Sequence, residues 1–407
     1  MKMLQKIINF TIYLVVFCLP LYLVSFKIGW VPFNILEVLI YVLFVLWVIN
    51  LKVGPEKCNL ATQGHYCFRS DLFFSDLFWP VLLIFFGVTI STWFSNDLEV
   101  SAGIWKGWFL APLLFLVVIN SHIRTKEQIN RILISLTFSG VGVALIALFY
   151  WFANNLAYDG RLQGFYLSAN YLAMYLSPIL VLSLYLYSFI KNKIVKILLI
   201  ISYLLLMIVI YLTCSYGAWL GLGIALIFIV LNRKDKKLAL ILLFLIILGL
   251  VLQIPSQKFQ GFLDLSYPSL KSRLVIWQSA WEISKDHFLI GIGPGMFQKY
   301  YLSYQDRFVL YSEWAVPQPH NIFLAFWLQT GLLGLIGFIW LLIVFFRNAL
   351  RSDLRKGRTS IISVILIASM IYILIHGLVD TTYWKNDLAL IFWLIIILGC
   401  KVSRPSD

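Results

Sequence analysis

The chain has 407 residues, of which 61% are hydrophobic and only 12% carry a charged side chain. Its mean hydropathy is +0.89, and apolar runs of about 20 residues, each able to cross a bilayer core, recur along the whole length. These values exclude a water-soluble globular protein and predict an all-α, polytopic membrane protein. A membrane β-barrel is also excluded, because its strands would appear as short segments of alternating polarity.

The apolar runs predict twelve transmembrane spans. The first run follows Lys2 and Lys6 and has no small-residue cleavage site behind it, so we expect a retained span and not a cleaved signal peptide. One large polar loop, 255–319, lies between the ninth and tenth spans. The spans are 7–26, 31–51, 76–94, 101–120, 132–153, 164–190, 194–212, 215–231, 238–254, 320–346, 360–379 and 388–400. They divide the chain into N-terminal helices (1–153), central helices (154–254), the loop (255–319) and C-terminal helices (320–407).

The basic residues predict the orientation of these spans. With the N-terminus inside, the inner segments hold 22 Lys and Arg residues, and the outer segments, which include Lys106, Arg161 and the 255–319 loop, hold 10. The acidic residues divide 7 inside and 11 outside. We therefore expect cytoplasmic termini and an extracytoplasmic loop. The net charge of +14 is then a topology signal. It does not indicate a nucleic-acid partner, because the basic clusters are short.

Two places in the first hundred residues carry metal-ligating side chains. Cys58, His65 and Cys67 share an inner segment, but a fourth zinc ligand is missing and the spacing fits no common zinc finger. Asp97 and Glu99 lie at an outer turn and could coordinate a cation, although a solvated acidic turn between two spans is the simpler interpretation. We expect neither place to hold a metal.

The polar loop begins with a predicted amphipathic helix over 269–286. Its apolar residues recur at helical spacing, which is typical of a helix that lies in the membrane interface. The tryptophans among them could be simple interfacial anchors. Arg273 on the same helix would sit at the level of lipid headgroups, where a guanidinium forms paired hydrogen bonds to phosphate. The apolar positions are Leu270, Leu274, Trp277 and Trp281.

Glycines and aromatic residues fill the rest of the loop. Gly291, Gly293 and Gly295 alternate along the chain and predict a turn with a close backbone approach. The aromatic side chains that follow could stack on sugar rings or form an interfacial belt. They are Tyr300, Tyr301, Tyr304, Tyr311 and Trp314.

The loop ends at Gln318-Pro319-His320-Asn321, where it meets the next apolar helix. A histidine at this junction faces both water and lipid, and an unperturbed histidine exchanges its proton near neutral pH. His320 could instead be a helix-start residue only, and Asn321 could cap the helix or orient the histidine. Further along, Gly331 and Gly334 are small enough to let helices pack closely.

Five segments, in this order, resemble the O-antigen ligase family of membrane glycosyltransferases and its polymerase relatives. They lie within about 155–400. One departure concerns the family's Ser-Arg-Gly before an apolar helix, because Tyr216 occupies the arginine position here; phosphate binding would then fall to Arg161, Arg273 or a lysine. The segments are Arg161-Leu-Gln-Gly164-Phe-Tyr-Leu-Ser-Ala-Asn170, Arg273-Leu-Val-Ile-Trp277-Gln-Ser-Ala280, Asp286-His287 to Gly295, His320-Asn321 to Gly334, and His376-Gly-Leu-Val-Asp380.

The resemblance implies a glycosyltransferase at the outer face of the bacterial inner membrane. It would move a glycan from a polyprenyl-pyrophosphate carrier, held among membrane lipids, to a hydroxyl-bearing lipid or glycan acceptor such as lipid A core. His320 would be the general base, and Arg273 and Arg161 would neutralise the pyrophosphate. Direct attack would invert the anomeric configuration. No metal or other cofactor is expected, because the arginines can carry the charge and the chain has no Asp-x-Asp motif. The other expected substrate-binding residues are Asn321, Asp380, Tyr216 and Trp277.

Two other functions remain open. A polymerase of the same superfamily would join repeat units, although a single large loop favours a ligase. A transporter or flippase would predict charges within the spans or paired broken helices, whereas the charges here gather in the loop. Arg161 could simply pair with Asp159, and Asp380 could orient His320 or be a plain loop acid. The acceptor stays open among core lipid, another envelope lipid, a protein side chain and a growing polymer.

Overall fold

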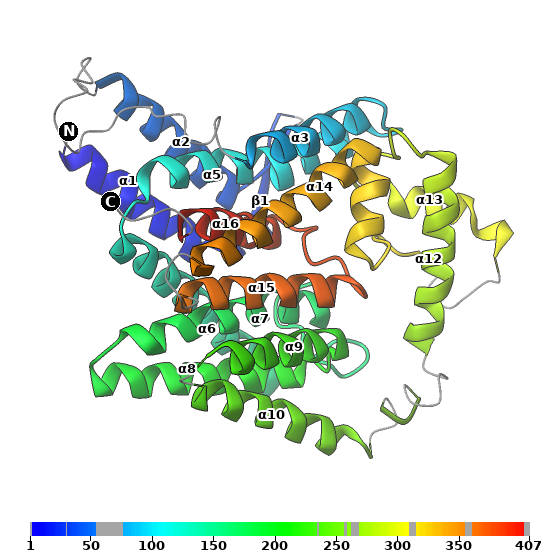
Figure 1. The fold of residues 1–407 in the computed structure, drawn as a ribbon. Helices are drawn as coiled ribbons and strands as arrows, with labels where there is room; N and C mark the ends of the chain where they lie inside the picture. The colour runs from blue at the N-terminus through cyan, green and yellow to red at the C-terminus, as the bar shows by residue number, and fades with distance from the viewer. Residues whose placement is uncertain are drawn as a thin grey trace.

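A computed structural model describes residues 2–29, 31–53, 76–233, 236–255, 259–261, 268–308, 315–354 and 360–402 of the chain. Most of these residues are helical. Long helices run side by side as a bundle, and the helix α12 (Pro268–Asp286) stands across one end of it (Figure 1). We call this end the α12 end of the bundle.

Among the described residues, six helices are long and apolar enough to cross a membrane. Shorter apolar helices lie between them along the chain, and each predicted span overlaps a helix. The prediction of an all-α, polytopic membrane protein is therefore confirmed. The six are Ile35–Lys52, Leu98–His122, Lys126–Phe152, Ala169–Phe189, Lys193–Leu212 and Ile322–Leu350.

The first span differs from its prediction. The helix α1 (Lys2–Phe17) ends nine residues before the predicted boundary at 26, because Pro20 has no N–H to donate to a carbonyl one turn back. The chain continues through a short 3-10 helix, η1 (Leu19–Leu23), into the strands β1 (Ser25–Ile28) and β2 (Val31–Asn34). The strands pair antiparallel, with Ser25 opposite Asn34. The sequence analysis did not predict this hairpin.

The next helices follow the predicted spans closely. They are α2 (Ile35–Val53), α3 (Phe78–Trp93), α4 (Leu98–Ile104), the π-helix η2 (Trp105–Leu110), α5 (Ala111–His122) and α6 (Lys126–Phe152). The helices α4, η2 and α5 form one continuous segment. The helix α6 begins six residues before its predicted span, because Thr125 and Gln128 form a capping box that makes the polar turn helical.

The centre of the bundle is formed by α7, which packs against α6, α8 and α15. Its side chains are buried along most of its length, including Pro178 within the helix. The central and C-terminal helices are α7 (Ala169–Phe189), α8 (Lys193–Leu212), α9 (Tyr216–Asn232), α10 (Lys237–Gln253), α14 (Ile322–Leu354), α15 (Ile361–Gly377) and α16 (Asn386–Val402).

The predicted loop helix exists as α12, but its buried face is not the predicted stripe. Ile276, Ala280 and Ile283 face inward and build a small core with the helix α13 (Phe297–Ser303). Leu274 and Trp281 are about half exposed. The prediction was based on the largest apolar side chains of the helix. The side chains that are buried under the loop are smaller on average. A short 3-10 helix, η3 (Gln305–Arg307), follows α13.

The glycine-rich turn packs backbone to backbone against a break in α14, as the close approach predicted. Gly291, Gly293 and Gly295 all have positive φ. Gly331 interrupts α14 with φ 68° and ψ −176°, and a Cβ atom there would lie 2.4 Å from the carbonyl oxygen of Leu289. The backbone N–H of Leu332 donates to this carbonyl at 3.0 Å. Gly331 therefore serves the turn and not only helix packing.

Candidate active site around Asp380

The buried carboxylate of Asp380 joins four segments of the chain. It lies between α15 and α16 and is 2% exposed. Its Oδ1 lies 3.1 Å from Nδ1 of His320 and accepts from the N–H of Thr381 at 2.9 Å. Its Oδ2 accepts from Nδ2 of Asn170 at 2.8 Å and lies 3.9 Å from Nη2 of Arg273. Of the expected alternatives for Asp380, this contact favours the one in which the carboxylate orients His320.

The charge state of Asp380 follows from these neighbours. Burial raises the pKa of the carboxyl, but the positive charge that His320 carries when its ring is protonated, the hydrogen bond from His320 and the guanidinium of Arg273 outweigh burial and hold the pKa well below its usual range. An ionised carboxylate can only accept hydrogen bonds. The contact therefore places the histidine proton on Nδ1 and leaves the lone pair on Nε2 free to accept a proton.

The backbone of His320 is held in an uncommon conformation. Its φ is +47°, which non-glycine residues rarely adopt. The indole N–H of Trp277 on α12 donates to the carbonyl oxygen of His320 at 3.2 Å. Trp277, expected to bind substrate or anchor the helix at the interface, thus also fixes the position of His320.

Asn321 caps α14. Its Oδ1 accepts from the N–H groups of Phe323 and Leu324 at 3.0 and 3.1 Å, and its Nδ2 donates to the carbonyl oxygen of Leu378 at 3.1 Å. Of the two alternatives for this residue, the cap is present, and the side chain in contact with the histidine ring is Asp380. The bond to Leu378 holds the start of α14 beside the segment that carries Asp380.

We call Asp380 and the side chains around it, Asn170, Arg273 and His320, the Asp380 cluster. Two arginines differ in how they contact it. Arg273 is partly exposed and approaches the carboxylate only at 3.9 Å, and its Nε is buried with no hydrogen-bond partner among the described residues. Arg161 pairs with Asp159 at 2.5 Å, as the simpler interpretation expected. Its Nη1 also donates to Oδ1 of Asn170 at 3.0 Å, which links it to the cluster. Arg273 therefore has more hydrogen-bonding capacity left for an anion.

Tyr216 begins α9 and lies among aromatic rings. It contacts Trp219 and Phe259 edge to face. The next residue, Gly217, lies against the buried ring of His376: a Cβ atom at Gly217 would be 2.8 Å from Cδ2 of that ring. The tyrosine at the usual arginine position thus brings an aromatic contact in place of a positive charge.

The candidate metal ligands have other structural roles or lie outside the described residues. Asp97 caps α4 by accepting from the N–H of Val100 at 3.1 Å. Cys58, His65 and Cys67 lie outside the described part of the chain. Within that part, no three His, Cys, Asp or Glu side chains come together in a group that could hold a metal ion.

Sequence reasoning missed several polar residues that the fold brings together. Asn170 links Asp380 to Arg161. Glu37 and Lys106 form a partly buried ion pair with 2.7 Å between Oε2 and Nζ, which the sequence analysis did not predict. The available signal was their position inside two predicted spans, because an ionisable residue within a span is a functional-site candidate.

Comparisons with known proteins agree with the resemblance. Residues 200–339 match the family model described as O-Antigen ligase. This stretch contains Arg273 and His320. A curated O-antigen ligase from Salmonella typhimurium (strain LT2) is 24% identical to the chain over 308 residues, which cover 72% of this chain and 74% of the relative. Both findings support a relationship to the O-antigen ligase superfamily. Asp380 lies beyond the stretch matched by the family model, and the fold brings it to His320.

Proposed function

We propose that this protein transfers a glycan from a polyprenyl-pyrophosphate carrier to a hydroxyl on an envelope acceptor, as an O-antigen ligase of the bacterial inner membrane. The contact between His320 and Asp380, with Arg273 beside the same carboxylate, carries the proposal. It combines a proton acceptor with a cation in one partly enclosed place. The match to the family model, the similarity to a curated O-antigen ligase and the apolar helices support the same function.

The proposed step is a single displacement at the anomeric carbon. The acceptor oxygen attacks this carbon, and the bond from the carbon to the phosphate oxygen breaks. The electron pair of that bond leaves with the lipid pyrophosphate. Nε2 of His320 takes the hydroxyl proton, and the resulting imidazolium is stabilised by Asp380. Attack from the face opposite the leaving group inverts the configuration.

The arginines suit the leaving group, whose negative charge grows as the bond breaks. A guanidinium offers a planar set of N–H donors that matches phosphate oxygens. Arg273 has a buried Nε without a partner among the described residues, so it can turn donors toward a pyrophosphate without breaking a strong ion pair. Arg161 would assist through its remaining donors. Electrostatic stabilisation of this kind is commonly the largest catalytic contribution.

A transfer assay with the full-length protein in lipid nanodiscs tests the proposal. The probes are a polyprenyl-pyrophosphate-linked glycan and core lipopolysaccharide without O-antigen. A ligase makes one new product that contains both, with inverted linkage and in the presence of EDTA. A ladder of longer lipid-linked glycans formed without the core acceptor would identify a polymerase. Movement of the lipid-linked glycan across the bilayer with no covalent product would overturn the proposal in favour of a transporter.

A further inference from the structure

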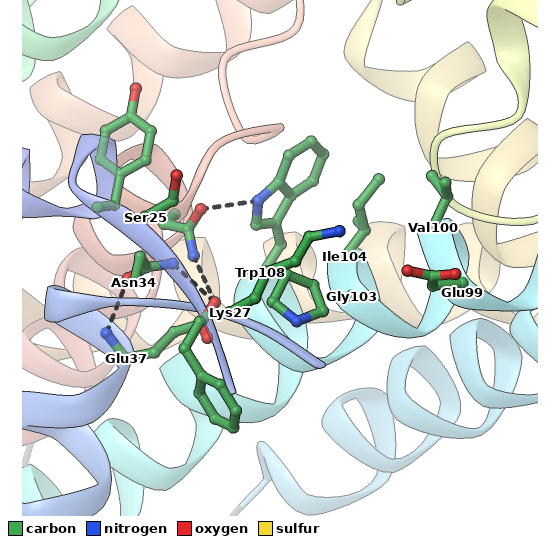
Figure 2. Close-up of a pocket in the computed structure, with 13 residues that line it drawn as sticks. Ser25, Lys27, Asn34, Glu37, Glu99, Val100, Gly103, Ile104 and Trp108 are labelled. Carbon is green, nitrogen blue, oxygen red and sulfur yellow. Dashed lines mark hydrogen bonds between the residues drawn. The ribbon is translucent and has the colours of Figure 1, made fainter. Parts of the chain in front are cut away.

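A polar cavity lies beside the hairpin and is separate from the Asp380 cluster. It has a volume of about 410 Å³. The hairpin strands, the start of α2, the segment α4–η2 and the first residue of α16 line it. In Figure 2, Ser25 and Asn34 from the hairpin lie on one side of the cavity, and Glu99 and Val100 from α4 lie on the opposite side. Its size falls within the range of small-ligand sites.

The inner wall of this cavity is a built polar network centred on Glu37. Its Oε2 receives the Lys106 ammonium at 2.7 Å. Its Oε1 accepts from Nδ2 of Asn34 at 2.8 Å and from Nδ2 of Asn386 at 3.2 Å, and the indole of Trp108 donates to Oδ1 of Asn386 at 3.0 Å. Buried polar groups that satisfy one another in this way hold a wall rigid.

The π-helix η2 makes room for this wall. A Cβ atom at Gly107 would lie 2.4 Å from Oε1 of Glu37, so only glycine lets the carboxylate lie against the helix. A π-helical turn is rare and commonly marks a functional site. Here it carries Lys106 and Trp108, and both side chains join the network. The irregular turn therefore forms part of the polar wall of the cavity.

The chemistry of the lining favours a sugar. The lining combines aromatic surface from Tyr22, Phe33 and Trp108 with amides and with the exposed side chains of Lys27 and Glu99 at the rim. Aromatic faces pack on the C–H face of a sugar ring, and amide and charged groups bond its hydroxyls. Among the described residues, no arginine lines the cavity, and the partly buried Lys106 behind its wall is paired with Glu37. A phosphate would therefore meet one lining cation, Lys27 at the rim, together with the carboxylates of Glu37 and Glu99.

The cavity is close enough to the Asp380 cluster to share one glycan with it. Asp380 and the cavity residue Asn386 are six positions apart, so at most about 20 Å of extended chain separates them. We propose that the cavity is a carbohydrate subsite, which holds a sugar unit of the donor or the acceptor glycan some units away from the reacting carbon. This inference rests on the proposed function for the identity of the glycan.

Gly103 offers a way to fill the cavity without disturbing its wall. It lies on α4, and the nearest atom to an added Cβ would be Cγ of Pro32 at 3.5 Å, an ordinary contact. The variant Gly103→Leu places an isobutyl group into the cavity. The matched control is Gly142→Leu on α6, where an added Cβ meets nothing within 4 Å. A second test variant, Glu99→Ala, removes an exposed rim group. Neither test position belongs to the Asp380 cluster.

The experiment measures binding of free oligosaccharides to the protein in nanodiscs by titration calorimetry, so it needs no transfer. The probes are core oligosaccharide and O-antigen repeat oligosaccharide from lipopolysaccharide of the source bacterium. We expect Gly103→Leu to weaken binding of one probe about tenfold or more, and Glu99→Ala to weaken it less. Gly142→Leu should bind like the wild type. Weakened core binding assigns the subsite to the acceptor, and weakened repeat binding assigns it to the donor.

Equal binding of both probes by the wild type and Gly103→Leu would overturn the subsite. A phospholipid that native mass spectrometry finds on the wild type and not on Gly103→Leu, with sugar binding unchanged, would also overturn it and identify a lipid site. A wild type that binds a probe through this cavity and yet makes no transfer product would overturn the proposed function while leaving the subsite in place.

Discussion

Nδ1 of His320 and Oδ1 of Asp380 lie 3.1 Å apart, although 60 positions separate the two residues. The contact decides which ring nitrogen can accept a proton, because the carboxylate takes the proton-bearing one. It also couples the start of α14 to the segment between α15 and α16. A single hydrogen bond therefore sets both the tautomer and the direction of the candidate base.

His320→Gln should lose about 10² to 10⁴-fold in transfer rate, since glutamine keeps hydrogen bonding but cannot act as a base. His320→Ala should lose as much, while both variants still insert and still bind the lipid donor. Asp380 keeps orienting the ring as the solution becomes acidic, since its pKa is held well below the usual range and it stays ionised. A glutamine variant with the wild-type rate would make His320 a structural residue.

Asp380→Asn should reduce the transfer rate by a factor similar to that expected for His320→Gln. An asparagine can turn its Nδ2 toward His320, so that Nδ1 accepts and the proton moves to Nε2, where it blocks base catalysis. The control is Asp159→Asn, because Asp159 belongs to the same network through Arg161 but does not touch the histidine. Rates are compared at saturating donor, after thermal unfolding has shown that both variants are folded. Equal rates for the two variants would contradict the orienting role.

Arg273→Ala should reduce transfer by roughly a hundredfold or more, the effect of losing one strong charge-assisted contact at the transition state. Arg273→Lys should restore activity only in part, because lysine keeps the charge and loses the paired donors. Lys271→Ala on the same helix is the control for general loss of positive charge, since its side chain is exposed. Nearly normal transfer by the alanine variant would show that Arg273 is an interfacial anchor.

Gly331→Ala should destabilise the protein by about 1 to 3 kcal/mol. The residue has φ +68°, and the new Cβ would collide with the carbonyl oxygen of Leu289 at 2.4 Å. The helical glycine Gly223, where an added Cβ meets nothing within 4 Å, provides the control; Gly223→Ala should be neutral or slightly stabilising. The measurement is the thermal unfolding midpoint in detergent. A midpoint unchanged in Gly331→Ala would mean that the turn can shift freely.

A cysteine at Ser303 should react with a membrane-impermeant thiol reagent in intact cells, because the 255–319 segment is expected outside the cytoplasm. Ser303 ends α13, and its side chain is exposed. The same substitution at Lys191, in an expected inner loop, should react only after lysis. Both are made in a background without the five native cysteines. Reversed labelling would overturn the predicted orientation.

Apolar runs predicted the helices well, because membrane crossing requires about 20 apolar residues whatever the tertiary contacts are. The sequence also drew attention to His320 and Arg273, since each is a polar side chain in a short pattern next to an apolar helix, and the fold brings both to Asp380. The bond from Trp277 to the His320 carbonyl was not predictable. It joins a side chain to a backbone oxygen 43 positions away, and no residue pattern encodes such a pair.

The cavity wall was missed for a related reason. Glu37, Lys106 and Asn386 come from three parts of the chain, and each appears in the sequence as an isolated polar residue near the end of a span. Only the packed bundle brings them within hydrogen-bonding distance. The hairpin before Glu37 was missed because its eight strand residues lie at the boundary of two predicted spans, where hydropathy alone cannot separate strand from helix.

The break in α14 decides how this protein can be recombined with its relatives. Ile292 donates to the carbonyl of Leu328, and Leu332 donates to the carbonyl of Leu289, so the turn is bonded to α14 on both sides of Gly331. A chimera joined at residue 320 would take the turn from one protein and the helix break from another. A graft that carries residues 268–332 as one piece keeps them together. The segment that can be exchanged as one unit is therefore longer than the loop and includes the first turns of a transmembrane helix.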